Sequence, residues 1–163
     1  DGLAEQLKGD SNYKFIQDLR AYCEKKVGEL TFPDAILKRI MLANNPDKGE
    51  EFVEKNYAQS IKELTWHLIK EQLAKDHGIK IDDNDVRESA RQMARAQFAQ
   101  YGMTNVPEDY LNGYADEMLK KRENVDSFVE AALDRKLAEA IKEVVKLNVK
   151  TVSLEEFNKL VSE

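Results

Sequence analysis

Apolar residues recur three or four positions apart along nearly the whole chain, which is the period of helices that bury one face. Between residues 12 and 27, for example, Ile16, Leu19, Cys23 and Val27 fall on one side of a helix. The same period predicts further helices at about 34–43, 50–76, 83–101, 108–122, 125–148 and 154–161. The pattern therefore predicts an all-α protein with about seven helices.

Residues typical of helix ends separate these segments. Pro33 and Pro107 suit the first turn of a helix, where a missing N–H costs nothing. Asn105 is expected to cap the helix that Pro107 begins, and Asp82 or its neighbour to cap the helix before it. Ser153 and Glu156 have the spacing of a capping box.

The buried faces of the longer helices can also be predicted from the spacing. The helix at 50–76 carries more apolar residues than one stripe holds, so two of its sides are expected to be covered. The expected stripe is Val53, Tyr57, Ile61, Leu64 and Leu68, widened by Trp66, Ile69 and Leu73. The next two helices are expected to bury Val86, Ala90, Met93, Ala94 and Phe98, and then Leu111, Tyr114 and Met118.

Composition and charge exclude several classes of protein. Hydrophobic residues make up 42% and charged residues 34%, a mixture typical of a folded domain. The 31 acidic residues outnumber the 25 basic ones, whereas nucleic-acid binding requires a basic surface. No run of about 18 apolar residues is present, so a membrane span is not expected. The single cysteine, Cys23, excludes an internal disulfide and fits a reducing compartment.

No group of residues has the arrangement of a catalytic or metal site. His67 and His77 are ten positions apart, which is not the spacing of two ligands on one helix face. The acidic groups at 47–51 and 82–85 stand at helix starts, where capping explains them. We therefore expect no enzyme activity, no metal and no cofactor.

Large, adaptable side chains gather around the two proline-containing breaks. Methionine repacks easily and tyrosine joins an apolar ring to a polar tip, so both suit surfaces that meet many partners. Each of them could instead pack one helix against the next at a corner. The residues predicted to contact a bound polypeptide are Phe32, Ile36, Met41, Phe52, Met93, Phe98, Tyr101, Met103, Tyr110, Tyr114 and Met118.

Four stretches, in this order and spacing, resemble the C-terminal region of bacterial trigger factors. They are Leu-Thr-Phe-Pro-Asp-Ala-Ile-Leu at 30–37, Leu-Thr-Trp-His-Leu-Ile-Lys at 64–70, Ile-Lys-Ile-Asp at 79–82 and Val-Ser-Leu-Glu-Glu-Phe-Asn-Lys-Leu at 152–160. The likeness covers residues 13 to 163. It implies an elongated multi-helix body with two long helical arms around a cradle.

The resemblance also implies a function. Trigger factors are ATP-independent chaperones that hold nascent or unfolded polypeptides and limit their aggregation in the cytoplasm. Residues 1–163 would then form one client-binding domain of a longer protein. Ribosome docking and prolyl isomerase activity belong to other domains of the family, which these residues do not contain. A homodimer is left open.

Two other functions remain open from the sequence. One is a periplasmic chaperone of outer-membrane proteins with a related fold, which a signal peptide in the full-length gene would favour. The other is a helical scaffold or adaptor that binds one folded partner. A chaperone should bind many unrelated unfolded chains, whereas an adaptor should recover a single partner.

Overall fold

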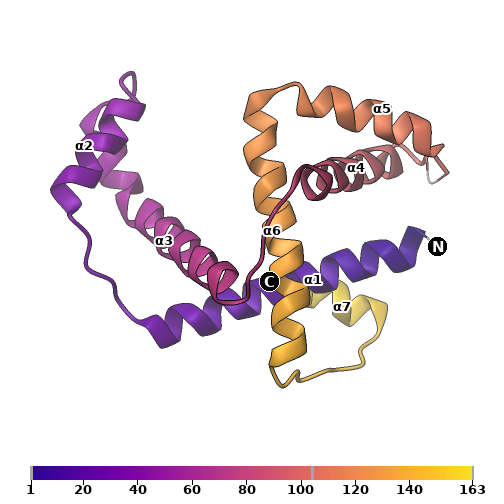
Figure 1. Cartoon of the computed structure of the whole chain (residues 1–163). Coiled ribbons are helices and arrows are strands. Elements are labelled where there is room, and N and C mark those ends of the chain that lie inside the picture. Colours follow the sequence, from indigo (N-terminus) through magenta and orange to yellow (C-terminus); the bar gives the residue numbers. More distant parts are fainter. Residues whose placement is uncertain (1, 104, 163) are drawn as a thin grey trace. The chain divides into compact units, whose positions relative to one another are not determined.

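A computed structural model describes residues 2–103 and 105–162, which form seven α-helices and no strand. The prediction of an all-α fold is confirmed. Two compact units can be separated: one comprises Gln17–Leu73, and the other joins the start of the first helix to everything from Ala74 onward. The helices, labelled in Figure 1, are α1 Gly2–Val27, α2 Asp34–Asn44, α3 Gly49–Asp76, α4 Asp83–Gln100, α5 Glu108–Leu119, α6 Arg122–Val144 and α7 Leu154–Ser162.

In the unit of residues 17–73, α2 and α3 form a hairpin held by polar contacts at its surface. Tyr57 Oη donates to Asp34 Oδ1 at 2.6 Å, and Lys38 Nζ lies 2.8 Å from Glu54. Desolvation, together with the bond to Asp34, raises the pKa of Tyr57 to about 12. Because α2 has no buried residue, its apolar side chains remain accessible.

The predicted stripe of α3 is partly wrong. Leu68 is 40% exposed, whereas Trp66 and Ile69 are buried. The contacts of α1 explain this, because Arg20 lies 5.9 Å from the Trp66 ring and pairs with Glu63 at 3.0 Å. These contacts cover the Trp66 side of α3. Helical period alone does not predict which side of a helix a neighbouring helix covers.

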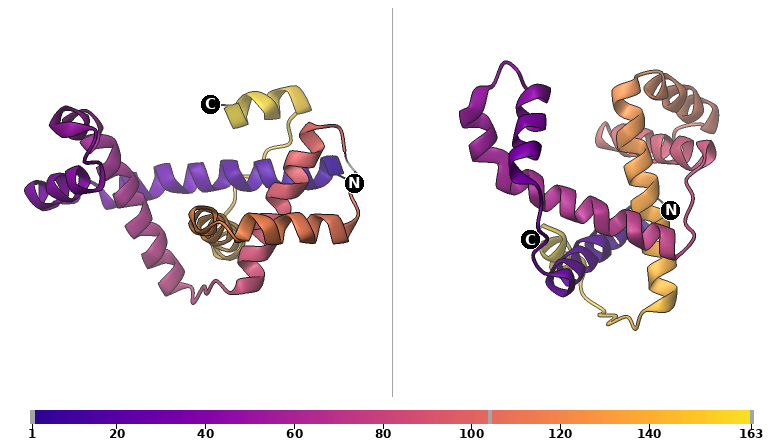
Figure 2. Two further views of the ribbon diagram at one scale, coloured as in Figure 1. Left: turned by 90° about the horizontal axis from the view of Figure 1, so that it is seen from above. Right: turned by 60° about the vertical axis from the view of Figure 1, so that its left-hand side comes forward.

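In the other unit, α4 packs against both α5 and α6, and α5 also contacts α6 (Figure 2). Ala90 and Ala115 have no exposed surface and pack around Phe128, which is 4% exposed. Half-buried Val86, Met118 and Leu119 border this cluster. Ala94 of α4 and Leu111 of α5 are also buried. Small side chains let the three helices approach closely, as dense protein interiors require.

Five sequence predictions in this unit need correction. Met93 is 47% and Tyr114 is 42% exposed, so neither is a core residue of its helix. Asn105 does not cap α5, because Pro107 precedes the helix and no side chain caps it. The break expected near residues 123–124 falls at 120–121, since α6 already begins at Arg122. The helix ends at Val144, so residues 145–148 lie beyond it.

The first helix begins at Gly2, about ten residues before the period predicts. Its early part contacts α6, where Lys142 donates to Asn12 and lies 5.0 Å from the Phe15 ring. Burial lowers the pKa of Lys142. Tertiary contacts therefore support a helix through Gly9, a residue that weakens isolated helices by about 1 kcal/mol.

Two helix starts carry capping boxes: the predicted one of Ser153 and Glu156 is confirmed, and Asp82, predicted only as one of two candidate caps, forms a second box with Asp85. Asp82 accepts from the Asp85 N–H and donates its own N–H to Asp85 Oδ2, each at 3.0 Å. Ser153 and Glu156 make the reciprocal bonds of the second box at 3.0 and 3.3 Å. The pKa of Glu156 is lowered mainly by the hydrogen bond that its carboxylate accepts from the Ser153 backbone.

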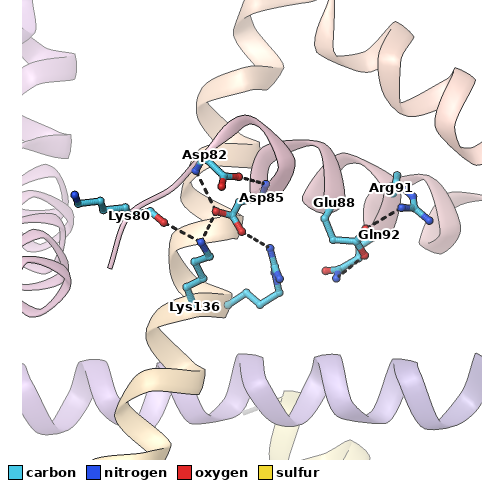
Figure 3. Close-up of polar contacts among 8 residues, drawn as sticks. Lys80, Asp82, Asp85, Glu88, Arg91, Gln92 and Lys136 are labelled. Atoms are coloured by element: carbon cyan, nitrogen blue, oxygen red, sulfur yellow. Dashed lines mark hydrogen bonds and ion pairs between the residues drawn. The ribbon is translucent and has the colours of Figure 1, made fainter. Parts of the chain in front are cut away.

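A polar junction fixes the start of α4 to α6 (Figure 3). Lys136 donates to Asp85 and, at 2.8 Å, to the carbonyl of Lys80 in the link before α4. Arg135 lies 3.6 Å from the other Asp85 oxygen. The Asp85 side chain is only 13% exposed, and the hydrogen bond from Lys136 is the main cause that lowers its pKa.

The replacement Asp85→Asn should lower the thermal unfolding midpoint at pH 7 by about 2–4 °C, a usual response of a chain of this size to losing one modest interaction. Asparagine can still accept the Asp82 N–H but carries no charge for Lys136. Because folding lowers the pKa of Asp85, its contribution is fully present above the unfolded carboxyl pKa of about 3.9 and is lost as the pH falls through the folded pKa.

Midpoints measured between pH 7 and pH 2 should therefore converge for the wild type and Asp85→Asn in acid. Asp83→Asn removes the same charge from the exposed side of the same turn and serves as the control. A constant difference across the whole pH range would show that the charge of Asp85 is not what stabilises the junction.

Candidate binding surfaces

Side chains around the turn between α4 and α5 form a concave apolar surface. Gly102 has a φ of +77°, which glycine adopts without strain, and the Met103 N–H donates to the Phe98 carbonyl at 2.9 Å. The turn thus ends α4 sharply and carries Met103 back beside the helix end. Residues after Val106 then enter α5, so side chains from both helices and the turn share one surface.

Two open, shallow hollows adjoin on this surface, with volumes of about 400 and 590 Å³. Phe98 and Tyr110 line both. The first hollow also has Asp109, Gly113, Tyr114 and Glu117, and the second has Gly102, Met103, Asn105, Val106 and Pro107. We call the two hollows together the α4–α5 groove.

Aromatic contacts fix part of the groove. The rings of Phe98 and Tyr114 have centroids 5.3 Å apart and are tilted by 59°, an arrangement favoured by aromatic quadrupoles. Tyr114 Oη also donates to Gln97 Oε1 at 2.9 Å. These two residues therefore form an ordered wall, while Tyr110, 72% exposed, stands open to solvent.

Charged residues beside the groove tie its two helices together. Arg95 pairs with Glu108 at 2.7 Å, Arg91 also contacts Glu108, and Arg87 pairs with Asp116 at 2.7 Å. The hydrogen bond from Arg95 is the main cause that lowers the pKa of Glu108. The other two acids of α5, Asp109 and Glu117, line the groove.

The structure brings together several of the residues predicted to contact a client. Phe98, Met103, Tyr110 and Tyr114 line the groove, and Tyr101, 80% exposed, follows the end of α4. Met93, which helical period predicts to be buried, is exposed on α4. Met118 is half-buried and packs against the Phe128 cluster, and it does not line the groove.

The other four predicted residues lie in the unit of residues 17–73. Ile36 is 57% exposed, and Phe32, Met41 and Phe52 are half-buried. Ser60 donates to the Met41 sulfur at 3.8 Å, and the Lys48 ammonium lies 4.5 Å from the Phe52 ring. This unit therefore has its own apolar surface, on α2 and the start of α3.

Some exposed apolar residues were not among the predicted contacts. Ile40 is 50% exposed, one turn after Ile36, and Val106 lines the groove. A spacing of four residues on α2 could have identified Ile40, and the position of Val106 beside Pro107 could have suggested a surface turn. Val145, Leu147 and Val149, between α6 and α7, are also exposed.

Further features of the described residues bear on metal binding, membrane crossing and the state of single side chains. Within residues 2–103 and 105–162, no three histidine, cysteine or acidic side chains gather as a metal site would require. None of the helices in this part of the chain has the length and apolar character needed to cross a bilayer. His67 is exposed and lies 3.5 Å from Glu71, one turn away, and burial raises the pKa of the Cys23 thiol.

These features define an all-α module whose helices present open apolar surfaces around ordered turns. A family model described as "Probable trigger factor, C-terminal domain" matches residues 11–161, and the chain belongs to this family. The family makes the chain a chaperone-type module. A comparison with curated proteins and one with solved structures gave no significant match.

Proposed function

We propose that this chain is the client-binding module of a cytoplasmic, ATP-independent chaperone. It holds nascent or unfolded polypeptides through the α4–α5 groove and through the exposed apolar side chains of α2 and the start of α3, and so limits their aggregation. It has no catalytic role of its own. Contact with the ribosome, and any prolyl isomerase activity, would depend on domains outside these residues.

The observation that carries this proposal is the exposure of the predicted contact residues in a trigger factor family chain. Ile36, Met93, Tyr101, Met103, Tyr110 and Tyr114 are all between 42% and 80% exposed, and none of the eleven is buried. Soluble proteins rarely keep large contiguous apolar patches exposed without a binding role. Open hollows suit short apolar segments of many sequences better than one rigid ligand.

Binding of this kind requires no nucleotide. A module that binds unfolded chains and not folded ones lowers the concentration of free unfolded chain by mass action. Dispersed apolar contacts give modest affinity and rapid release, so a released segment can fold. Methionine and tyrosine adapt to different client side chains by rotating or by satisfying a polar neighbour.

Aggregation of a chemically denatured protein, diluted into buffer with the 163-residue chain, tests the proposal. Light scattering should fall as the chain is added, equally with and without ATP, for at least two unrelated clients. An adaptor for one folded partner would leave scattering unchanged. Unchanged scattering with every client would refute the proposal.

A further inference from the structure

The segment between α6 and α7 has the side-chain alternation of a β-strand, although it is neither helix nor strand in this structure (Figure 1). Val145, Leu147 and Val149 alternate with Lys146, Asn148 and Lys150. In an extended chain the first three lie on one side and the others on the opposite side. Val145 is already extended, with φ −107° and ψ 154°.

Both the side chains and the backbone of this segment are available. Val145, Leu147 and Val149 are 43%, 41% and 81% exposed. The Val145 N–H donates to the Ile141 carbonyl. Among the described residues that follow, Ser153 is the first whose backbone N–H again donates a hydrogen bond. Within residues 2–103 and 105–162, the backbone groups of residues 146–152 therefore have no hydrogen-bond partner, like those of a strand at the edge of a sheet.

We propose that residues 145–151 bind an extended segment of an unfolded polypeptide by β-strand pairing, and favour segments in which acidic residues alternate with apolar ones. This inference rests on the proposed function and adds a second mode of client binding to the apolar surfaces. Backbone pairing recognises any extended chain, while the alternating side chains select among sequences.

Charge determines which sequences fit. Lys146 and Lys150 share one side of the segment, and no Asp or Glu occurs between Glu143 and Glu155. The segment is thus positive within a chain of net charge −6. Opposite charges facing each other across two strands stabilise their pairing, so acids in the client should face the two lysines.

The same lysines disfavour a second copy of this chain as the occupant. Antiparallel pairing of two copies centred on Asn148 would place Lys146 of one opposite Lys150 of the other. Like charges directly opposite destabilise a strand pair, and lysine on an exposed edge is a common protection against self-association. A ribbon of two strands is only marginally stable in water, so binding of the client should be weak and reversible.

A peptide titration tests this inference with the whole 163-residue chain. The probe is a fluorescently labelled heptapeptide of alternating valine and glutamate, and its binding is followed by anisotropy. The double variant Lys146→Glu/Lys150→Glu should bind it about tenfold more weakly, the effect of losing two favourable charge pairs. The same variant should prefer a valine–lysine peptide. Both lysines are exposed, so the fold should be unchanged by circular dichroism.

Two controls separate backbone pairing from simple charge attraction. A probe N-methylated at alternate residues keeps its charges but loses strand donors, and should no longer bind. Hydrogen exchange should slow at residues 146–150 when the unmethylated probe binds. Equal binding of both probes, or of both protein variants, would overturn the inference. Continued suppression of aggregation in that case would leave the proposed function standing.

Discussion

Replacing Phe128 by alanine is expected to lower the free energy of unfolding by about 3–5 kcal/mol. Phe128 is 4% exposed and is the largest of the buried side chains in its cluster with Ala90 and Ala115, among the residues described. Neither alanine can fill the space that the ring would leave. Since a domain is stable by only about 5–15 kcal/mol, the packing of α4, α5 and α6 would lose much of its stability.

Chemical denaturation followed by circular dichroism measures this loss. Tyr101→Ala removes an aromatic side chain that is 80% exposed, so it controls for the change of residue type and should cost little. A Phe128→Ala protein within about 1 kcal/mol of the wild type would mean that the three helices do not depend on this cluster.

The triple replacement Tyr101→Ser, Met103→Ser and Tyr110→Ser is expected to raise the amount of chain needed for half-suppression of aggregation by about tenfold or more. The three side chains are 80%, 55% and 72% exposed, so the fold should tolerate their loss. Aromatic residues contribute most of the energy of many interfaces, at more than about 1 kcal/mol each, and about 1.4 kcal/mol changes affinity tenfold.

A matched control removes similar apolar surface elsewhere. Tyr13→Ser, Tyr22→Ser and Val144→Ser change side chains that are 55%, 61% and 64% exposed and were not predicted to contact a client. Light scattering with the same denatured client compares the two triple variants. If both lose suppression to the same extent, general surface hydrophobicity and not the α4–α5 groove carries the binding.

Local chemistry predicted the starts of α4 and α7 correctly. Asp82 and Ser153 cap their helices through contacts with residues three positions away, so the information lies within a few residues. The end of α4 at Gly102 also follows from a local preference, because glycine adopts a positive φ without strain. The predicted cap by Asn105 is wrong, because α5 begins directly after Pro107 and no side chain caps it.

The buried faces were less predictable because they depend on which helix covers which side. Helical period placed Leu68, Met93 and Tyr114 inward, yet each is at least 40% exposed. In contrast, Phe128 was not singled out and is central to a buried cluster. An apolar stripe shows that a helix is covered somewhere, but only the neighbouring helices decide the side.

The groove was predicted in part because its residues flank a turn. Phe98, Met103 and Tyr110 lie within thirteen positions of one another, around Gly102 and Pro107. The proximity of the Phe98 and Tyr114 rings depends on how α5 folds back on α4, which the sequence pattern did not reveal.

The buried alanines of the Phe128 cluster have a consequence for how such a module can diversify. Ala90 and Ala115 fix the spacing of the helices from within, while Tyr101 and Tyr110 project outward and support nothing in the core. Related chains can therefore exchange the outward residues, and with them the range of sequences they recognise, at little cost in stability. The inward methyl groups leave no such freedom, because any larger side chain there would push the helices apart.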